Sequence, residues 1–264
     1  MEIFNKSYTD YWQDRVNQLT DGTKIADSEI VKLFLSMIDF KEDDSLVDMG
    51  CSFGRFYNTL SEYTKHVSGI DIEASAIERA SAFKYDNLKV GPLEEMPFAD
   101  SSFDKAFCWA VLDVTTQEKV FAETNRILKM NGVFLVTGKN DNYSMEDDVA
   151  FVAERNARLK DFPNHFTDIQ FLIANIDVFG FKLLKGFIFE KRGDFGLAKA
   201  LPLTNETINT PFYEYILILE KVKDNSSEYP VICDMYSKTA RLKANEAGFA
   251  NIDSYFESDF NLKK

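Results

Sequence analysis

Short apolar runs alternate with helix-like patterns between residues 45 and 140, and this alternation constrains the fold more than any other feature of the sequence. Helical periodicity is clearest at residues 74–83 and 118–129. Strands that alternate with helices form βαβ units and a parallel sheet with helices on both faces. The sequence therefore predicts a doubly wound α/β fold, in which the first five strands cover residues 45–49, 66–71, 88–91, 104–110 and 133–138.

Two further apolar runs follow the regular region and complete the predicted sheet. Residues 181–190 and 211–221 are rich in Phe, Tyr, Leu and Ile, and they predict a sixth and a seventh strand. The segment after them carries another helical pattern but no second set of strands. We therefore expect one seven-stranded, mostly parallel domain over residues 1–222 and an appendage over residues 223–264.

The charge of the chain narrows the classes of partner. The chain has 264 residues, of which 43 are Asp or Glu and 30 are Lys or Arg, so its formal net charge is -13. A strongly acidic protein repels a phosphate backbone rather than attracting it. We therefore expect a small-molecule partner and no nucleic acid, while the oligomeric state is not predicted.

Cysteine usage and hydropathy predict the cellular setting. The three cysteines lie far apart and form neither a CxxC motif nor a Cys/His ligand pattern, so we predict neither a disulfide framework nor a metal site. No apolar stretch approaches the roughly eighteen residues of a membrane span. The first ten residues lack the basic and apolar regions of a signal peptide. These features predict a cytoplasmic protein that does not bind membranes.

The turn VDMGCSFGR, residues 47–55, joins the first predicted strand to the next helix and is the strongest candidate for chemistry. If it holds a nucleotide-like cofactor, Gly50 lets the backbone approach the ligand and Gly54 permits close packing of strand and helix. The dinucleotide-binding pattern G-x-G-x-x-G fits poorly, because Ser52 and Arg55 occupy its second and third glycine positions.

The same turn also satisfies G-x-S-x-G, the nucleophile elbow of α/β-hydrolases, with Ser52 as the nucleophile. A hydrolase would need a downstream histidine, for which His165 is the candidate, and an oxyanion motif that does not occur. That interpretation also leaves Asp71 without a role. Asp71 ends the second predicted strand, where a doubly wound sheet presents an acid to ribose hydroxyls. Cofactor binding therefore explains more of the sequence than hydrolysis does.

Four segments in order resemble the motifs of class I S-adenosylmethionine-dependent methyltransferases, which have a Rossmann-like sheet. These segments are VDMGCSFGR, VSGIDIEASAIERA, GPLEEMPFADSSFDKAFCWAVLD and NRILKMNGVFLVTG. The resemblance covers about residues 45–140 and implies S-adenosyl-L-methionine as the cofactor. It also implies that residues 1–43 form a cap, with Arg15 facing the carboxylate of the cofactor, and that residues 140–210 form the acceptor side.

The resemblance implies a cofactor site at specific positions. Two positions depart from the family pattern, because Ser52 replaces a usual glycine and Pro92 replaces a usual aspartate near the adenine. Leu93 would offer its N–H to the adenine instead, and Glu94 would supply the missing acid. The cofactor residues so implied are Arg15, Asp48, Gly50, Ser52, Gly54, Asp71, Ile72, Leu93, Glu94 and Trp109.

The acceptor side is defined less sharply. Asp113 falls where many relatives carry a histidine, and His165 lies in the region that builds substrate-binding surface, so both are candidate catalytic residues. The basic residues Lys182, Lys185, Lys191 and Arg192 suggest an anionic acceptor. We expect methyl transfer to an oxygen or nitrogen of a small polar, anionic or sugar- or nucleotide-linked metabolite. The alternatives are a non-catalytic cofactor-binding regulatory module and a serine hydrolase.

Overall fold

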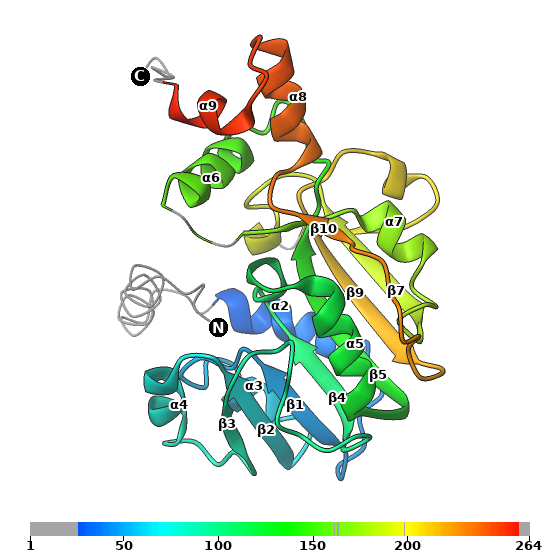
Figure 1. The fold of residues 1–264 in the computed structure, drawn as a ribbon. Helices are drawn as coiled ribbons and strands as arrows, with labels where there is room; N and C mark the ends of the chain where they lie inside the picture. The colour runs from blue at the N-terminus through cyan, green and yellow to red at the C-terminus, as the bar shows by residue number, and fades with distance from the viewer. Residues whose placement is uncertain (1–25, 161, 163, 198, 259–264) are drawn as a thin grey trace.

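A computed structural model of the chain describes residues 26–258 except 161, 163 and 198. A twisted sheet forms its centre, and helices lie against both faces of the sheet (Figure 1). A group of three helices lies at one end of the molecule, beyond the edge of the sheet at which β5 ends (Figure 1). The predicted α/β fold with a mostly parallel central sheet is therefore confirmed.

The sheet has the strand order β3-β2-β1-β4-β5-β9-β7-β8. Strands β3, β2, β1, β4 and β5 are parallel, whereas β9 runs antiparallel to both β5 and β7. The sequence predicted seven strands, and the eighth is the two-residue edge strand β8, which is too short for a pattern of alternation. The strands are β1 (Ser45–Met49), β2 (His66–Asp71), β3 (Leu88–Val90), β4 (Phe103–Cys108), β5 (Leu128–Lys139), β7 (Phe181–Phe189), β8 (Leu201–Pro202) and β9 (Glu214–Lys221).

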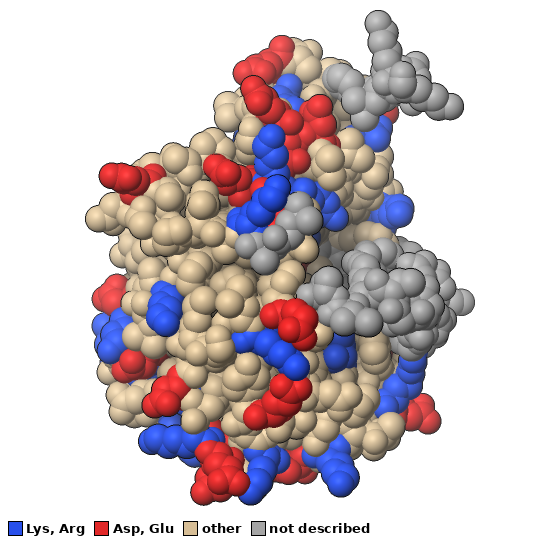
Figure 2. Space-filling model, turned by 180° about the vertical axis from the view of Figure 1, so that it is seen from behind, with Lys and Arg blue, Asp and Glu red and all other residues tan. Residues whose placement is uncertain are grey.

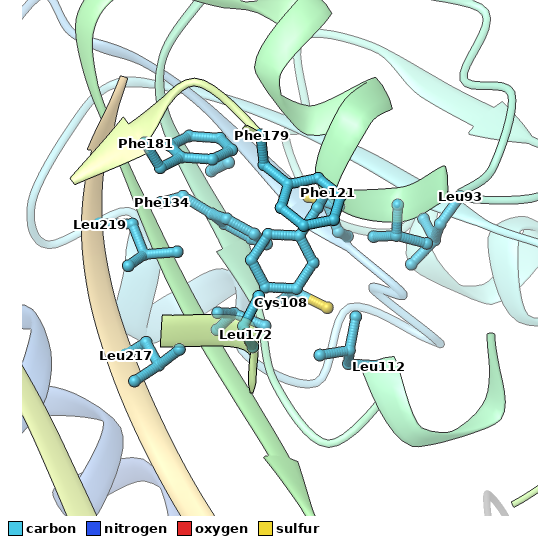
Figure 3. Close-up of a cluster of buried hydrophobic side chains, with 14 of the residues drawn as sticks. Leu93, Cys108, Leu112, Phe121, Phe134, Leu172, Phe179, Phe181, Leu217 and Leu219 are labelled. Carbon is cyan, nitrogen blue, oxygen red and sulfur yellow. The ribbon is translucent and has the colours of Figure 1, made fainter. Parts of the chain in front are cut away.

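Each face of the sheet buries its own set of helices. On one face, α5 (Gln117–Ile127) and α7 (Ile169–Ala174) bury Phe121 and Leu172 with apolar side chains of the strands. Phe121 lies 5.7 Å from Phe134 between ring centroids, which is a usual separation for an edge-to-face pair (Figure 3). Val120, Phe121 and Thr124 recur at the helical period, and this apolar stripe explains why α5 forms where the sequence predicts it.

The opposite face is covered by α2 (Ala26–Leu35) and α3 (Tyr57–Leu60). Their apolar side chains pack with Trp109 and with residues of β5, β7 and β9. Helix α4 (Ala74–Ala80) lies against β2 and β3. The helix that the sequence predicts after the glycine turn is short, because regular helix covers only Tyr57–Leu60 and turns follow.

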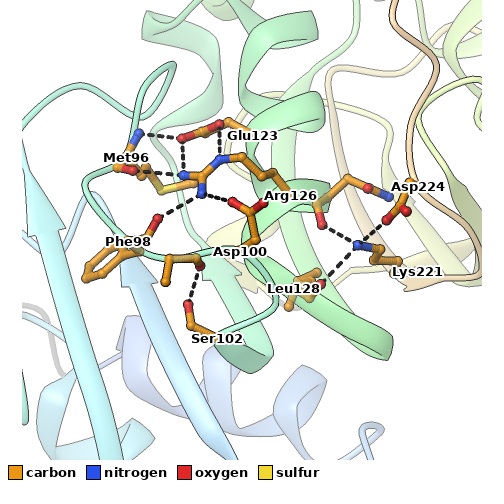
Figure 4. Close-up of polar contacts among 11 residues, drawn as sticks. Met96, Phe98, Asp100, Ser102, Glu123, Arg126, Leu128, Lys221 and Asp224 are labelled. Carbon is orange, nitrogen blue, oxygen red and sulfur yellow. Dashed lines mark hydrogen bonds and ion pairs between the residues drawn. The ribbon is translucent and has the colours of Figure 1, made fainter.

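A polar network around Arg126 holds α5 against the loop between β3 and β4. Arg126 donates hydrogen bonds to the carboxylate of Glu123, to the carboxylate of Asp100 and to the backbone carbonyls of Met96 and Phe98 (Figure 4). The long loop between β3 and β4 is thereby fixed to the helix. Charge-assisted hydrogen bonds of this kind are shorter and stronger than neutral ones.

A second group of three helices is formed by α6 (Asp148–Leu159), α8 (Lys238–Glu246) and α9 (Ile252–Glu257). Phe151, Ala240 and Phe256 belong to its separate apolar core. Before α8, strand β10 (Cys233–Asp234) pairs with β6 (Phe166–Thr167) to form a small second sheet. No helix was predicted between residues 140 and 167, so α6 is an element that the sequence pattern did not indicate. We call the three helices the helical lobe.

A buried carboxylate connects two helices of the helical lobe, α6 and α8. Glu154 of α6 accepts hydrogen bonds from the hydroxyl of Tyr143 and from the N–H and hydroxyl of Ser237, the N-cap of α8. Burial raises the pKa of Glu154, and these donors offset part of the shift. The last segment of the chain therefore packs against a helix formed much earlier in the sequence. The division at residues 222 and 223 stays a proposal.

We expect Lys221→Met to destabilise the fold. The Lys221 side chain is 3% exposed, and its ammonium group donates to the carbonyls of Asn125 and Leu128 at the end of α5 and pairs with Asp224 (Figure 4). Methionine keeps the packing but leaves buried carbonyls without a donor, which costs about 1–3 kcal/mol. Urea denaturation measures this loss. Lys223→Met is the control, because Lys223 is exposed. The free energy of unfolding of this variant should differ from that of the wild type by less than about 0.5 kcal/mol.

Candidate functional site

The loops that follow β1, β2, β4 and β5 meet at one edge of the sheet, because parallel strands bring their carboxyl ends together. Gly50 has φ +74°, and a side chain there would lie 2.4 Å from Val111 in the loop after β4. Its N–H donates to the carbonyl of Ile70. Gly50 thus allows the β1 loop to pack directly against the β4 loop while it is tied to β2.

The rest of the glycine turn is equally constrained. Gly54 has φ +83°, and a Cβ there would lie 2.6 Å from the ring of Phe83, which follows α4. Ser52 adopts φ +50°, a left-handed conformation that is uncommon for a residue other than glycine. The absence of a side chain at Gly54 thus lets the turn pack closely against Phe83.

Asp71 holds the glycine turn by direct hydrogen bonds. One carboxylate oxygen accepts the N–H of Ser52 at 2.8 Å, and the other accepts the N–H of Glu73 at 2.9 Å. Burial raises the pKa of Asp71, and these two N–H groups offset part of that shift because they stabilise the charged form. The backbone N–H of Ile72 also stabilises the carboxylate, and since a carboxylate has about four acceptor positions, these three donors leave room for a hydroxyl group of a ligand.

Asp48 lies below the turn and points into the protein. It is buried at the end of β1, and the hydroxyl of Tyr85 donates to its carboxylate at 2.9 Å. Burial raises the pKa of Asp48 to about 7, the Tyr85 hydrogen bond lowers it, and the nearby charge of Asp71 raises it. This geometry gives Asp48 a supporting contact beneath the turn and beside Asp71.

The residues predicted for the adenine side lie in different environments. Ile72 is 41% exposed directly after Asp71, where it can flank a ring. Leu93 is buried in the core on the α5 side. Glu94 accepts the N–H of Thr116 at the start of α5, so one of its oxygens already has a partner. Pro92 is exposed in the same loop. The contact of Glu94 with Thr116 was not predicted from the sequence.

Trp109 follows β4 and is 4% exposed. Its ring is stacked on Phe107 at 5.7 Å between centroids and lies 5.1 Å from Phe195. These contacts place most of the indole in the core next to the carboxyl edge of the sheet. Trp109 therefore packs behind the candidate site. Arg15, which the sequence predicts to face the carboxylate of the cofactor, lies outside the described residues.

On the acceptor side, the structure brings Asp113 and His165 together, although they are far apart in the sequence. The N–H of His165 donates to the carbonyl of Asp113 at 2.6 Å. The carboxylate of Asp113 accepts a hydrogen bond from Lys139, whose ammonium group also donates to Asn164. Burial lowers the pKa of His165, and the nearby charge of Arg158 lowers it further. Its Nδ1 atom is buried and has no hydrogen-bond partner within the described residues.

Sequence analysis missed several charged residues of this cluster. Lys139 ends β5 and pairs in register with Glu214, which begins β9. Arg192 donates to the hydroxyl of Tyr213 at 2.7 Å. Of the four basic residues proposed for an anionic acceptor, Arg192 reaches this cluster, whereas Lys182 pairs with Glu220. Each of Lys139 and Glu214 could have been found as a charged residue at the edge of an apolar run, whereas their pairing leaves no such signal.

The geometry does not assemble a serine hydrolase. The N–H of Ser52 is bound to Asp71, and no hydrogen bond joins Ser52 to either histidine, both of which are described. His66 begins β2 at the opposite edge of the sheet and contacts Asp86. In addition, no group of three His, Cys, Asp or Glu side chains could hold a metal ion in the described part of the chain.

Comparisons with known proteins agree with this arrangement. Residues 47–136 match the family model described as a methyltransferase domain. The chain is 30% identical over 154 residues to the uncharacterized methyltransferase YcgJ of Bacillus subtilis, covering 55% of this chain and 59% of YcgJ. It spans about three-fifths of the length of two of the curated relatives that it matches.

Two solved structures share the fold. A methyltransferase of Thermotoga maritima, described as a possible histamine N-methyltransferase, has a TM-score of 0.60 and 18% identity over 82% of this chain and 98% of its own. The geranyl diphosphate C-methyltransferase of Streptomyces coelicolor, solved with S-adenosyl-L-homocysteine, has a TM-score of 0.54 and 15% identity over 74% of this chain and 77% of its own.

The sheet order, the glycine turn and these matches define a class I methyltransferase fold. Residues 47–136 match a methyltransferase domain, and the chain shares the fold of solved S-adenosylmethionine-dependent methyltransferases. S-adenosylmethionine is the cofactor that the comparisons support. The residues at the carboxyl edge fit this cofactor, because the backbone N–H groups on Asp71 do not fill its acceptor capacity, and the carboxylate lies beside the Gly50–Ser52 turn.

We expect Asp48→Asn to flatten the dependence of stability on pH. The pKa of Asp48 is about 7 in the folded chain, above its value of 3.8 when exposed, so its contribution to stability is complete below pH 4 and is lost as the pH rises through 7. The wild-type free energy of unfolding should fall relative to the variant by up to about 1.4 kcal/mol per pH unit in that window.

Urea denaturation from pH 4 to pH 8 measures both curves. Asp43→Asn is the matched control, because Asp43 is exposed and its substitution should leave the wild-type slope unchanged. Parallel curves for the wild type and Asp48→Asn would contradict the buried, protonated state of this carboxyl group.

Proposed function

We propose that the chain transfers the methyl group of S-adenosylmethionine to an oxygen or nitrogen of a small polar metabolite. The observation that carries this proposal is the Asp71 carboxylate, which is ordered by two backbone N–H groups and keeps acceptor positions at the carboxyl edge. The proposed cofactor residues are those that the sequence analysis named, with Gly50, Ser52 and Asp71 as the centre of the site.

When bound, the cofactor would supply an electrophilic methyl group on a positively charged sulfur. Loss of this methyl group would leave a neutral thioether. The protein therefore has to align the acceptor and exclude water more than it has to activate a leaving group. Asp71 and the turn at Gly50 orient the donor, and Val111 closes the turn from the β4 side. The acceptor then lies beyond the ends of β4, β5 and β9, where the charged cluster is found.

Asp113 and His165 are proposed as walls of the acceptor site. Asp113 neutralises Lys139, and His165 is held by the Asp113 carbonyl. Since the free nitrogen of His165 is buried, positioning fits this side chain better than direct proton transfer. Arg192 keeps further N–H donors for an anionic group of the acceptor, because one terminal nitrogen is bonded to Tyr213.

The nature of the partner follows from charge. On the face shown in Figure 2, acidic and basic side chains are interspersed over the described surface. The net charge of -13 disfavours nucleic acid as the acceptor. No described helix combines the length and apolar character needed to cross a membrane. The cytoplasmic location predicted from the sequence stays a prediction.

We expect Asp71→Ala to weaken the binding of S-adenosylmethionine by about 10- to 100-fold, because a charged hydrogen bond is worth about 1.5–3 kcal/mol. Isothermal titration calorimetry of the purified chain measures the affinity. Asp86→Ala is the control, since Asp86 lies at the opposite edge beside His66 and its loss should leave the affinity unchanged.

A screen with labelled S-adenosylmethionine and small amines, hydroxy acids and sugar phosphates tests the transfer itself. Methylation of any of these compounds supports an enzyme. Binding of the cofactor without transfer would favour the regulatory module. Equal affinities of the wild type and Asp71→Ala for S-adenosylmethionine would contradict the proposed cofactor site.

A further inference from the structure

Glu214 is a carboxyl group without a hydrogen-bond partner in a cluster where its neighbours are paired. It begins β9, next to Lys139 of β5 on one side and Phe189 of β7 on the other. Because side chains alternate along a strand, Glu214 faces the same side of the sheet as Ile216, in the layer that contains Trp109. This position lies at the carboxyl edge, where the acceptor site is proposed.

The recorded hydrogen bonds of the cations around Glu214 go to other groups. Lys139 donates to Asp113 and Asn164, and Arg192 donates to the hydroxyl of Tyr213. The Glu214 carboxylate accepts no hydrogen bond and forms no ion pair with any residue that the structure describes, although Glu214 is half-buried. Burying a carboxyl group without a hydrogen-bond donor is unfavourable. The Glu214 carboxyl group is therefore available to a donor from a ligand.

The pKa of this group agrees with such a role. Burial raises the pKa of Glu214 to about 7; Lys139 and Arg192 lower it, while Asp113 and Asp147 raise it. A carboxyl group with a pKa near neutrality is suited to accept a proton at physiological pH. Of the other candidate bases, the Asp113 carboxylate is paired with Lys139, and the free nitrogen of His165 is buried.

We propose that Glu214 accepts the proton of the methyl acceptor, an amine or hydroxyl compound whose N–H or O–H donates to the Glu214 carboxylate. This inference rests on the proposed function. The acceptor nitrogen or oxygen forms a bond to the methyl carbon, and the carbon–sulfur bond breaks with its electron pair remaining on sulfur. The proton of the acceptor moves to a carboxylate oxygen of Glu214, which balances the reaction, and solvent later removes it.

The first test measures the carboxyl group directly and needs no acceptor. Carbon-13 labelling of glutamate side chains and NMR titration of the full chain should show one carboxyl resonance with a midpoint of about 7 that is absent from Glu214→Gln. Glu220→Gln is the control on the same strand, because Glu220 pairs with Lys182 at the other end, and it should retain this resonance. A midpoint near 4.5 for Glu214 would overturn the proposal.

The second test uses the compound that the wild-type chain methylates best in the screen of amines and hydroxy acids. Glu214→Gln should lower kcat by about 100-fold while its affinity for S-adenosylmethionine, measured by calorimetry, stays at the wild-type value. The wild-type rate should rise with pH through about 7, and the variant should lose this limb. Glu214→Asp should restore the limb, and Glu220→Gln should behave as the wild type.

The outcomes separate this inference from the function on which it rests. A chain that binds S-adenosylmethionine and methylates no compound contradicts the proposed function, and the role of Glu214 falls with it. A Glu214→Gln variant that works at the wild-type rate, or that keeps the pH limb, overturns the role of Glu214 alone. Unchanged cofactor affinity in the variant shows that any loss of rate does not come from misfolding.

Discussion

The carboxylate of Asp71 is the contact on which the carboxyl edge of this fold depends. It receives N–H groups from the β1 turn and from the segment that enters α4, so three parts of the chain are fixed at one point. Both N–H groups stabilise the charged form of Asp71, so they offset part of the rise in its pKa that burial causes. The turn is therefore ordered before any ligand arrives, which reduces the conformational entropy lost on binding.

Neighbouring contacts extend this order across the sheet. Gly50 brings the β1 turn against Val111, and the 3-10 turn that follows Val111 contains Asp113. The Asp113 carboxylate then binds Lys139 at the end of β5. The proposed donor and acceptor sides of the site are thus linked through one continuous set of short contacts. A displacement of the glycine turn would reach the acceptor side through packed groups rather than through solvent.

The sequence was informative where local physics decides structure. Short apolar runs such as residues 66–71 can be recognised as buried strands, and β2 covers those residues. Helix α6 was missed because one of its buried positions is Glu154, a polar residue whose partners, Tyr143 and Ser237, are known only from the tertiary structure. The two residues of β8 carry no period at all.

The candidate site shows the same division. Gly50 and Asp71 belong to short motifs with fixed spacing, so a sequence can indicate them. Lys139 and Glu214 become neighbours through an antiparallel pairing of strands distant in the sequence, and register of that kind leaves no local signal. Likewise, the four basic residues near position 190 form no common patch, because strand direction and ion pairs send Lys182 and Arg192 to different places.

The helical lobe has a consequence for how such a chain could diversify. Its apolar core is separate from the two cores on the faces of the sheet, and its helices are joined through Glu154 and Ser237 rather than through the glycine turn. The core of the lobe includes Tyr213 and Phe166, which border the cluster of Asp113, Lys139 and Arg192. Substitutions in the lobe can therefore reshape that surface while the contacts between Asp71 and the glycine turn persist.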